Sequence, residues 1–354
     1  MAEKNIPSKR KSPDEPLLRV RDMKQYFKLG GDELKAVDNV SFDVKDGEVL
    51  GIVGESGCGK TTTGRTIIKL YEPTGGDVWF DGYHIGTGTS WAKKQVKEAE
   101  AAGNKELAAQ LKKQMAADKA EVKEDLKSGI MDKMQMIFQD PVASLDPRMT
   151  VREIIAEGLR IRGITDKEYI DKKVTEMLTL VGLVPEHAER YPHEFSGGQR
   201  QRIGIARAIV LEPSLIIADE PVSALDVSIQ AQVINLLNDL RNNMGLTIIF
   251  IAHDLSVVKY FSNRILVMYF GKMVELADSR ELFKHPLHPY TRSLLSAIPL
   301  PDPRYEKQRK RISYVPAVDH DYSEDKPSWR EVSPGHFVSC NDAEFARYQE
   351  ELSK

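Results

Sequence analysis

Apolar and polar residues alternate along some stretches of this chain and recur at helical spacing along others. Val40, Phe42 and Val44 alternate with polar residues, as expected of a half-buried strand. Short, mainly apolar runs predict further strands at residues 49–53, 78–80, 134–138, 215–218 and 246–252. Helical spacing predicts helices within residues 151–184, 201–211 and 229–244. The first of these stretches supplies core candidates: Ile154, Ile155, Leu159, Val174, Met177, Leu178 and Val181. Strands that alternate with helices indicate an α/β protein with a parallel sheet covered on both faces.

Residues 90–127 have a different character, because they are rich in Ala, Lys, Glu and Gln and contain no proline. Their apolar residues keep near one face of a helix: Val96, Leu107, Leu111, Met115, Val122 and Leu126. The sequence Ala102-Gly103-Asn104 favours a break into a helical pair. We interpret the segment as an inserted surface helix with a thin apolar stripe. The alternative is a docking element for a partner helix.

The two ends of the chain differ in composition from its middle. Residues 1–16 hold three prolines and many charges, which predicts a disordered tail. A domain is expected over residues 17–285. Residues 264–275 are predicted to form a hairpin that turns at Gly271-Lys272. Prolines recur beyond residue 285, so we expect residues 286–354 to form an extended, lightly packed C-terminal extension.

Composition narrows the class of protein. The chain has 354 residues, 41% of them hydrophobic and 29% charged, with a formal net charge of −3, which is typical of a globular protein without a general affinity for nucleic acid. No apolar run approaches the ~20 residues of a membrane span, and no apolar signal core follows the polar N-terminus, so we expect a cytoplasmic location. The two cysteines, Cys58 and Cys340, cannot supply the four thiolates of a usual iron–sulfur site, so we expect no such cluster.

The strongest chemical motif is a phosphate-binding loop between a predicted strand and a predicted helix. Its residues are Gly54, Glu55, Ser56, Gly57, Cys58, Gly59, Lys60, Thr61 and Thr62. Glycines let backbone N–H groups converge on phosphate oxygens, while the lysine reaches the β- and γ-phosphates and Thr61 can ligate Mg²⁺. The alternative is a glycine-rich turn without a ligand. Because helix N-termini favour the thiolate, we also expect Cys58 to react readily with thiol reagents.

Two further motifs extend this site. Asp219 and Glu220 end a predicted buried strand, which delivers carboxylates to the edge of the sheet where α/β proteins bind ligands. Asp219 suits the Mg²⁺ shell, and Glu220 suits a base that orients the attacking water. A second site for anions is predicted where a helix begins at Ser196, Gly197, Gly198 and Gln199. The alternative for this segment is a helix cap with a flexible turn.

Together these motifs resemble the ATP-binding cassette (ABC) ATPases of membrane transporters. The resemblance implies a RecA-like P-loop core with an antiparallel β part, and a helical subdomain over about residues 140–200. It also implies that Gln139 forms the glutamine loop and ligates Mg²⁺, and that His253 senses the γ-phosphate. Ser196–Gln199 would be the signature that faces the ATP of a partner chain, and Asp226 would belong to the D-loop. The aromatic residue that stacks on adenine falls on Phe27, with Tyr26 as the alternative.

Within that family, the chain is similar to the F-type subunit of the oligopeptide/dipeptide importer group, on segments that include 138–141, 191–199 and His288-Pro289-Tyr290-Thr291. This implies ATP and Mg²⁺ as cofactors and a peripheral location on the cytoplasmic face of the cell membrane. The implied partners are a second, unlike ATPase subunit, two membrane permease subunits and an extracellular peptide-binding lipoprotein, with no nucleic acid. Alternative substrates of such importers are nickel and glutathione. Other hypotheses are a cassette ATPase acting on DNA or ribosomes, a P-loop kinase or GTPase, and a binding-only subunit.

Overall fold

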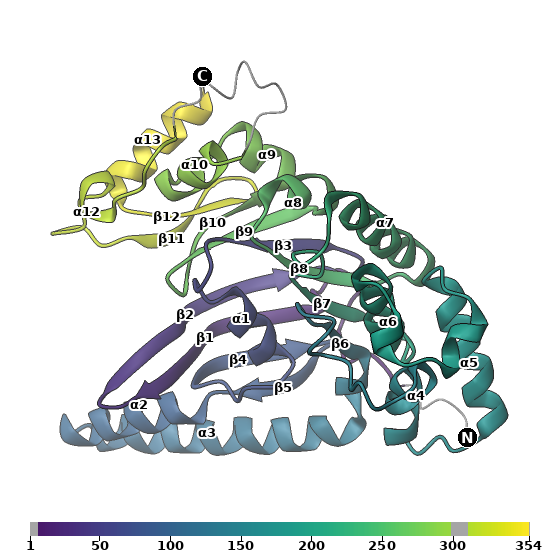
Figure 1. Cartoon of the computed structure of the whole chain (residues 1–354). Coiled ribbons are helices and arrows are strands. Elements are labelled where there is room, and N and C mark those ends of the chain that lie inside the picture. The colour runs from purple at the N-terminus through teal and green to yellow at the C-terminus, as the bar shows by residue number, and fades with distance from the viewer. Residues whose placement is uncertain (1–5, 299–310, 354) are drawn as a thin grey trace.

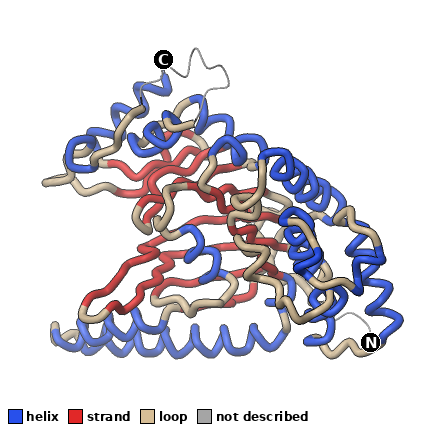
Figure 2. Tube along the Cα trace, viewed as in Figure 1, coloured by secondary structure: helices blue, strands red, loops and turns tan. Residues whose placement is uncertain are grey.

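The computed structural model describes residues 6–298 and 311–353, and its strands form two sheets that face each other (Figures 1 and 2). One sheet has four strands in the order β2-β1-β4-β5, and the other has eight in the order β11-β12-β10-β9-β3-β8-β7-β6. The first helix after the phosphate loop, α1 (Lys60–Ile67), packs against strands of both sheets. The two sheets therefore enclose the helix on which the nucleotide motif ends.

The centre of the larger sheet is parallel, which confirms the predicted α/β class. Strand β3 pairs in parallel with β8 and with β9, while β7 pairs in parallel with β8 and with β6. These strands are β3 (Val49–Val53), β6 (Met134–Ile137), β7 (Leu215–Asp219), β8 (Thr247–Ala252) and β9 (Arg264–Tyr269). All residues of β3, β7 and β8 are buried, because helices and the second sheet cover both faces.

The smaller sheet is wholly antiparallel. It consists of β1 (Leu18–Leu29), β2 (Asp32–Val44), β4 (Gly75–Phe80) and β5 (Tyr83–Thr87). Val40, Phe42 and Val44 are buried, as their alternation with polar residues predicts. Helix α3 (Lys105–Asp125) contacts β5 and α2 (Thr89–Ala101) contacts β4, so both helices lie beside the strands of this sheet that are farthest from β2 (Figure 1).

Helices gather at one end of the parallel strands and along their outer face (Figure 1). They are α4 (Val151–Ile161), α5 (Lys167–Leu180), α6 (Gly197–Ile209), α7 (Val227–Met244) and α8 (Leu255–Phe261), with 3₁₀ turns η3 (Pro185–Glu189) and η4 (Pro192–Glu194). Helices α4, α5 and α6 pack on one another. All seven core candidates of residues 151–184 are buried, which confirms the helical period predicted from the sequence.

The inserted segment is a helical pair, α2 (Thr89–Ala101) and α3 (Lys105–Asp125), followed by the 3₁₀ turns η1 (Leu126–Ser128) and η2 (Ile130–Lys133). The break falls at the expected place, since Gly103 has a φ of 76° and Asn104 caps α3 by accepting a hydrogen bond from the Leu107 N–H. The predicted apolar stripe is wrong at one position, because Leu107 is 42% exposed and Ala108 is buried instead.

His84 of β5 ties the insert to the antiparallel sheet. Its Nδ1 lies 3.3 Å from a Glu121 carboxylate oxygen of α3, and its Nε2 lies 3.0 Å from an Asp77 oxygen of β4. The His84 backbone N–H donates to Asp125 at 2.7 Å. Burial lowers the pKa of His84, but the hydrogen bonds and charges of Asp77 and Glu121 outweigh burial and raise it above its ordinary value. Asp118 also lies close enough to form a group of possible metal ligands with His84 and Glu121, but both ring nitrogens already face carboxylates.

The C-terminal extension is packed rather than extended, so that expectation was wrong. Strand β10 (Lys272–Asp278) follows β9, and β12 (His336–Cys340) pairs with it and with β11 (Ser328–Ser333), which widens the main sheet. The helices are α9 (Ser279–Lys284), α10 (Pro289–Ser296), α12 (Pro316–Asp319) and α13 (Asp342–Ser353). Tyr290 and Tyr348 are fully buried, because they fill the space between these elements. The β9–β10 turn is also one residue earlier than predicted, at Phe270 and Gly271, which both have positive φ.

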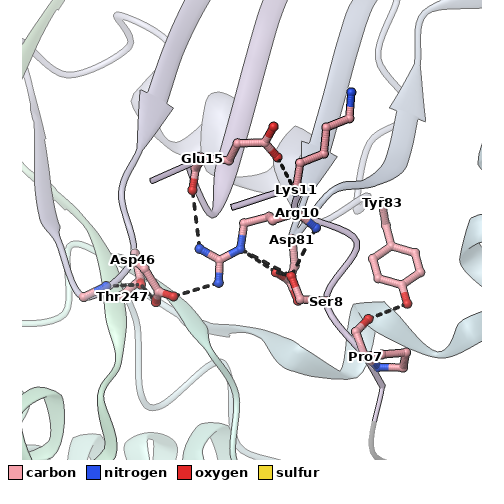
Figure 3. Close-up of polar contacts among 10 residues, drawn as sticks. Pro7, Ser8, Arg10, Lys11, Glu15, Asp46, Asp81, Tyr83 and Thr247 are labelled. Carbon is pink, nitrogen blue, oxygen red and sulfur yellow. Dashed lines mark hydrogen bonds and ion pairs between the residues drawn. The ribbon is translucent and has the colours of Figure 1, made fainter. Parts of the chain in front are cut away.

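Residues 6–16 lie against the domain, so the expectation of a disordered tail fails for them; residues 1–5 lie outside the described part. Arg10 donates to Asp81 at 2.7 Å and to Asp46 at 2.8 Å, and thereby joins the β4–β5 turn to the connection between β2 and β3 (Figure 3). Tyr83 donates to the Pro7 carbonyl at 2.7 Å, and Lys9 pairs with Asp125. The composition is that of a disordered segment, but its basic side chains meet carboxylates that are distant in sequence.

Candidate functional site

The phosphate loop, residues 54–62, connects β3 to α1 and needs its glycines. Gly54 and Gly59 have φ values of 149° and 103°, and a Cβ atom on either would lie 2.2 Å from a backbone oxygen, of Met268 and Ala36 respectively. Side chains other than hydrogen are excluded at both positions. The strand, loop and helix predicted from the sequence are therefore present, with the loop at the carboxyl end of β3.

Lys60 and Cys58 lie inside this loop. Lys60 is 4% exposed, and its ammonium group donates to the carbonyl oxygens of Gly54 and Glu55 at 2.8 and 2.9 Å. Cys58 is 5% exposed, and its sulfur lies 3.8 Å from Lys60 Nζ. Burial raises the pKa of Cys58 more than the nearby Lys60 lowers it, so the expected thiolate character is wrong.

Thr61 and Asp219 meet where α1 begins. The Thr61 hydroxyl donates to Asp219 Oδ1 at 2.7 Å, and Asp219 is fully buried at the end of β7. Its other oxygen, Oδ2, is buried without a hydrogen-bond partner among the described residues, with an Arg65 nitrogen at 3.8 Å. Burial raises the pKa of Asp219, against the Thr61 hydrogen bond and the Arg65 charge. The Thr61 hydroxyl and the unpaired carboxylate oxygen of Asp219 are oxygen ligands of the kind that a hard cation such as Mg²⁺ prefers.

Glu220, Gln139 and His253 form one cluster although they follow three different strands. A Glu220 carboxylate oxygen accepts a hydrogen bond from Gln139 Nε2 at 3.0 Å and lies 3.1 Å from His253 Nδ1. Glu220 has a φ of 43°, and its backbone N–H donates to the Ile251 carbonyl of the neighbouring strand at 2.9 Å. Parallel strands β6, β7 and β8 thus deliver these side chains to the same edge, as the sequence predicts. For Gln139, the structure shows contact with Glu220, and its role toward Mg²⁺ stays a prediction.

The signature residues lie elsewhere on the chain, at the start of α6. Ser196 Oγ accepts from the Gln199 N–H at 3.3 Å, and Gln199 Oε1 accepts from the Ser196 N–H at 3.0 Å, which forms a capping box. Gly197 and Gly198 form the first helical turn after Ser196. Asp226 caps α7 by accepting from the Ile229 N–H at 3.0 Å. Both segments thus present helix N-termini, which favour anions.

The two candidate aromatic residues for adenine differ in exposure. Tyr26 is buried, its hydroxyl donates to Asp38, and its ring lies edge-on to Trp91. Phe27 is half-buried and lies edge-on to Tyr71, with ring centroids 5.4 Å apart. Phe27 is therefore the more accessible of the two.

The chain belongs to the ABC transporter family, whose model matches residues 37–223. A second model, described as the C-terminal region of oligopeptide/dipeptide transporters, matches residues 274–323. The first match lies within the domain expected over residues 17–285, and the second spans the boundary expected at residue 285.

Relatives that match over nearly their full length identify the group within this family to which the chain is similar. The chain is 54% identical over 336 residues to the oligopeptide transport ATP-binding protein OppF of Bacillus subtilis strain 168, covering 94% of this chain and 99% of the relative. It is 48% identical over 340 residues to the oligopeptide transport ATP-binding protein AmiF of Streptococcus pneumoniae, covering 96% and 99%.

Solved structures agree on the fold. A dimeric ATP-binding cassette in a post-hydrolysis state, bound to ADP and Pi, matches with a TM-score of 0.57 and 28% identity, over 74% of this chain and 99% of that one. No helix in the described part of the chain combines the length and apolar character that a membrane span requires.

Proposed function

We propose that this chain is the ATP-hydrolysing subunit of an importer for oligopeptides or dipeptides. The observation that carries the proposal is the likeness to oligopeptide transport ATP-binding proteins over nearly the whole length of both chains, including the C-terminal region. The cluster of Gln139, Glu220 and His253 beside the phosphate loop supports turnover rather than binding alone.

In the proposed reaction, the backbone N–H groups of residues 54–62 bind the ATP phosphates, and Lys60 offsets their charge. Thr61 and Asp219, with Gln139, would hold Mg²⁺, which neutralises charge on the β- and γ-phosphates when bound. Glu220 orients the attacking water in line with the γ-phosphate, and His253 contacts that phosphate. Phe27 provides the face for adenine.

The proposed assembly pairs this chain with a second, unlike ATPase subunit. Ser196, Gly197, Gly198 and Gln199 then complete the partner's ATP site, and Asp226 lies at the shared interface. ATP binding draws the two subunits together, and hydrolysis separates them, since ADP and phosphate no longer bridge the interface. Two permease subunits in the membrane and an extracellular peptide-binding lipoprotein complete the importer, with this chain at the cytoplasmic face.

A deletion strain tests the substrate. Loss of this chain should abolish growth on short peptides as the amino-acid source, while free amino acids still support growth. Complementation with the wild-type gene should restore uptake, and complementation with Lys60→Ala should not. Unimpaired peptide uptake in the deletion strain, without a second copy of the gene, would overturn the peptide assignment and make nickel and glutathione the next substrates to assay.

A further inference from the structure

In the described part of the chain, a side chain of the C-terminal region, Tyr290 of α10, bonds to the phosphate loop. Its hydroxyl oxygen accepts a hydrogen bond from the backbone N–H of Glu55, the second residue of the loop, at 2.9 Å. Tyr290 is 1% exposed, so the acceptor side of this bond is shielded from water, although Glu55 itself is exposed. The contact joins the segment that matches the C-terminal region of oligopeptide/dipeptide transporters to the loop of the ABC domain.

Buried polar contacts fix the start of α10 and hence the direction of Tyr290. Glu275 of β10 is fully buried, and its carboxylate accepts from the backbone N–H groups of Leu287 and His288 at 2.8 and 3.1 Å. His336 of β12 lies 2.8 Å from the same carboxylate. His288 Nδ1 in turn accepts from the Tyr290 N–H at 3.1 Å. The first turn of α10 is therefore anchored to strands β10 and β12 of the main sheet.

Aromatic rings hold Tyr290 from the side. Its ring centroid lies 4.5 Å from that of Tyr269, at the end of β9, and 5.4 Å from that of Tyr314. The Tyr314 hydroxyl lies 3.1 Å from His320 Nε2. Close packing on two sides leaves the Tyr290 hydroxyl little freedom, so it acts as a fixed acceptor for the loop.

We propose that Tyr290 is a positioning residue that holds the phosphate loop in its nucleotide-binding shape. Other hydrogen bonds also hold the loop: Gly271 N–H donates to the Cys58 carbonyl at 2.9 Å, and the Thr61 hydroxyl donates to Asp219. Within the loop, Lys60 bonds to the carbonyls of Gly54 and Glu55. Lys60 must also serve the phosphates, whereas Tyr290 stays free of them. Fixing Glu55 orders the loop before ATP arrives, which lowers the entropic cost of binding.

The test is Tyr290→Phe, which removes the acceptor and keeps the ring. The role of Tyr290 rests on the proposed function, in which residues 54–62 bind the phosphates of ATP. We expect the dissociation constant of the full-length chain for a fluorescent ATP analogue to rise by about threefold to tenfold, the effect of one lost hydrogen bond. In the assembled transporter, the KM for ATP should rise by a similar factor, while kcat at saturating ATP changes by less than about twofold. A general loss of structure would lower kcat as well.

Two variants separate this role from a disturbance of the aromatic cluster and from a failure of the phosphate site itself. Tyr314→Phe removes a hydroxyl from the same aromatic cluster without touching the loop, and should leave ATP binding unchanged. Lys60→Ala should abolish binding. If Lys60→Ala binds as the wild type does, the proposed phosphate site is wrong. If Lys60→Ala fails to bind and Tyr290→Phe binds within twofold of the wild type, the phosphate site stands and the role of Tyr290 is overturned.

A measurement on the unmodified chain covers the case in which Tyr290→Phe does not fold. Hydrogen exchange of the Glu55 amide should be slow in the nucleotide-free protein, because its N–H is bonded to a buried hydroxyl. Exchange of this amide as fast as in an unfolded peptide would contradict the proposal.

Discussion

Glu220 has a left-handed backbone at the end of a buried strand, where its carboxylate meets two side chains from neighbouring strands. A non-glycine residue in this conformation costs about 1–3 kcal/mol, and such strain concentrates at functional sites. The Ile251 carbonyl holds the Glu220 N–H and thereby fixes the strained turn. The backbone therefore directs the carboxylate toward Gln139 and His253.

For Glu220→Gln we expect ATP binding close to that of the wild type and a fall in kcat of at least about a hundredfold. The amide keeps the shape of the side chain but cannot accept a proton from water. ATPase assays of the assembled transporter, with nucleotide binding measured in parallel, check this. Glu72→Gln is the control, because that side chain is 74% exposed and pairs only with Lys69 among the interactions described. Wild-type turnover by Glu220→Gln would remove Glu220 from the reaction.

Cys58 should react slowly with N-ethylmaleimide at neutral pH. The thiol is buried, and its raised pKa leaves little thiolate, so labelling should be more than about tenfold slower than in the unfolded chain. The rate should increase with pH as the thiolate forms. Mass spectrometry distinguishes Cys58 from Cys340, whose burial raises its pKa to about 11. Fast labelling of Cys58 in the folded protein would show that the loop opens.

At the scale of elements, the sequence predicts strands and helices that depend on a local period of apolar residues. It misses contacts between segments that are distant in the sequence. Strand β3 matches its predicted bounds, because a glycine loop ends a wholly apolar run. The site residues at the ends of β6, β7 and β8 come together, because parallel strands share an edge. The prediction for residues 6–16 was wrong, since nothing near Arg10 in the sequence shows that Asp46 and Asp81 will pair with it. The contact of Tyr290 with Glu55 spans two family regions and has no local signal beyond the His288–Thr291 motif.

The attachment of the helical insert should depend on pH through His84. The pKa of His84 is raised in the folded state, so its protonated form stabilises the fold. This stabilisation is complete below the pKa of the unfolded state, about 6.5, and is lost as the pH rises through the pKa of the folded state. We expect His84→Gln to lower the melting temperature more at pH 6 than at pH 9.

Controls on the same helix test that assignment. Glu121→Gln removes one carboxylate that faces His84 and should reduce the pH dependence, whereas Glu124→Gln should not, because Glu124 pairs with Lys127 and is 73% exposed. Asp77 and Asp118 also face or lie near the ring, so the double variant His84→Gln/Glu121→Gln checks that their titration does not account for the effect. An equal loss of melting temperature at both pH values would contradict the role of His84 protonation.

At the scale of the whole molecule, the two proposed halves of an ATP site lie on different parts of the fold. The phosphate loop and the Glu220 cluster lie at the edge of the parallel strands, while Ser196 begins α6 within the helical group (Figure 1). Ser196 and Gln199 bond to each other in a capping box at this helix N-terminus, which in the proposed assembly faces the ATP of a second subunit. In the proposed assembly, each ATP site is therefore built from two chains.

Ser196→Arg should therefore leave ATP binding by the isolated chain unchanged and inhibit the assembled transporter. The bulky cation fills the space where the partner's γ-phosphate is expected, so ATP-driven closure of that site fails. We expect the ATPase rate of the complex to fall by at least about tenfold. The isolated chain should have a low basal ATPase rate that the substitution does not alter. Arg200 follows in the same helix and donates to the Pro192 carbonyl at 2.8 Å, so Arg200→Lys serves as a nearby control for the integrity of the subdomain. If Ser196→Arg instead abolishes nucleotide binding by the isolated chain, the signature acts within its own subunit, and the two-chain site is wrong.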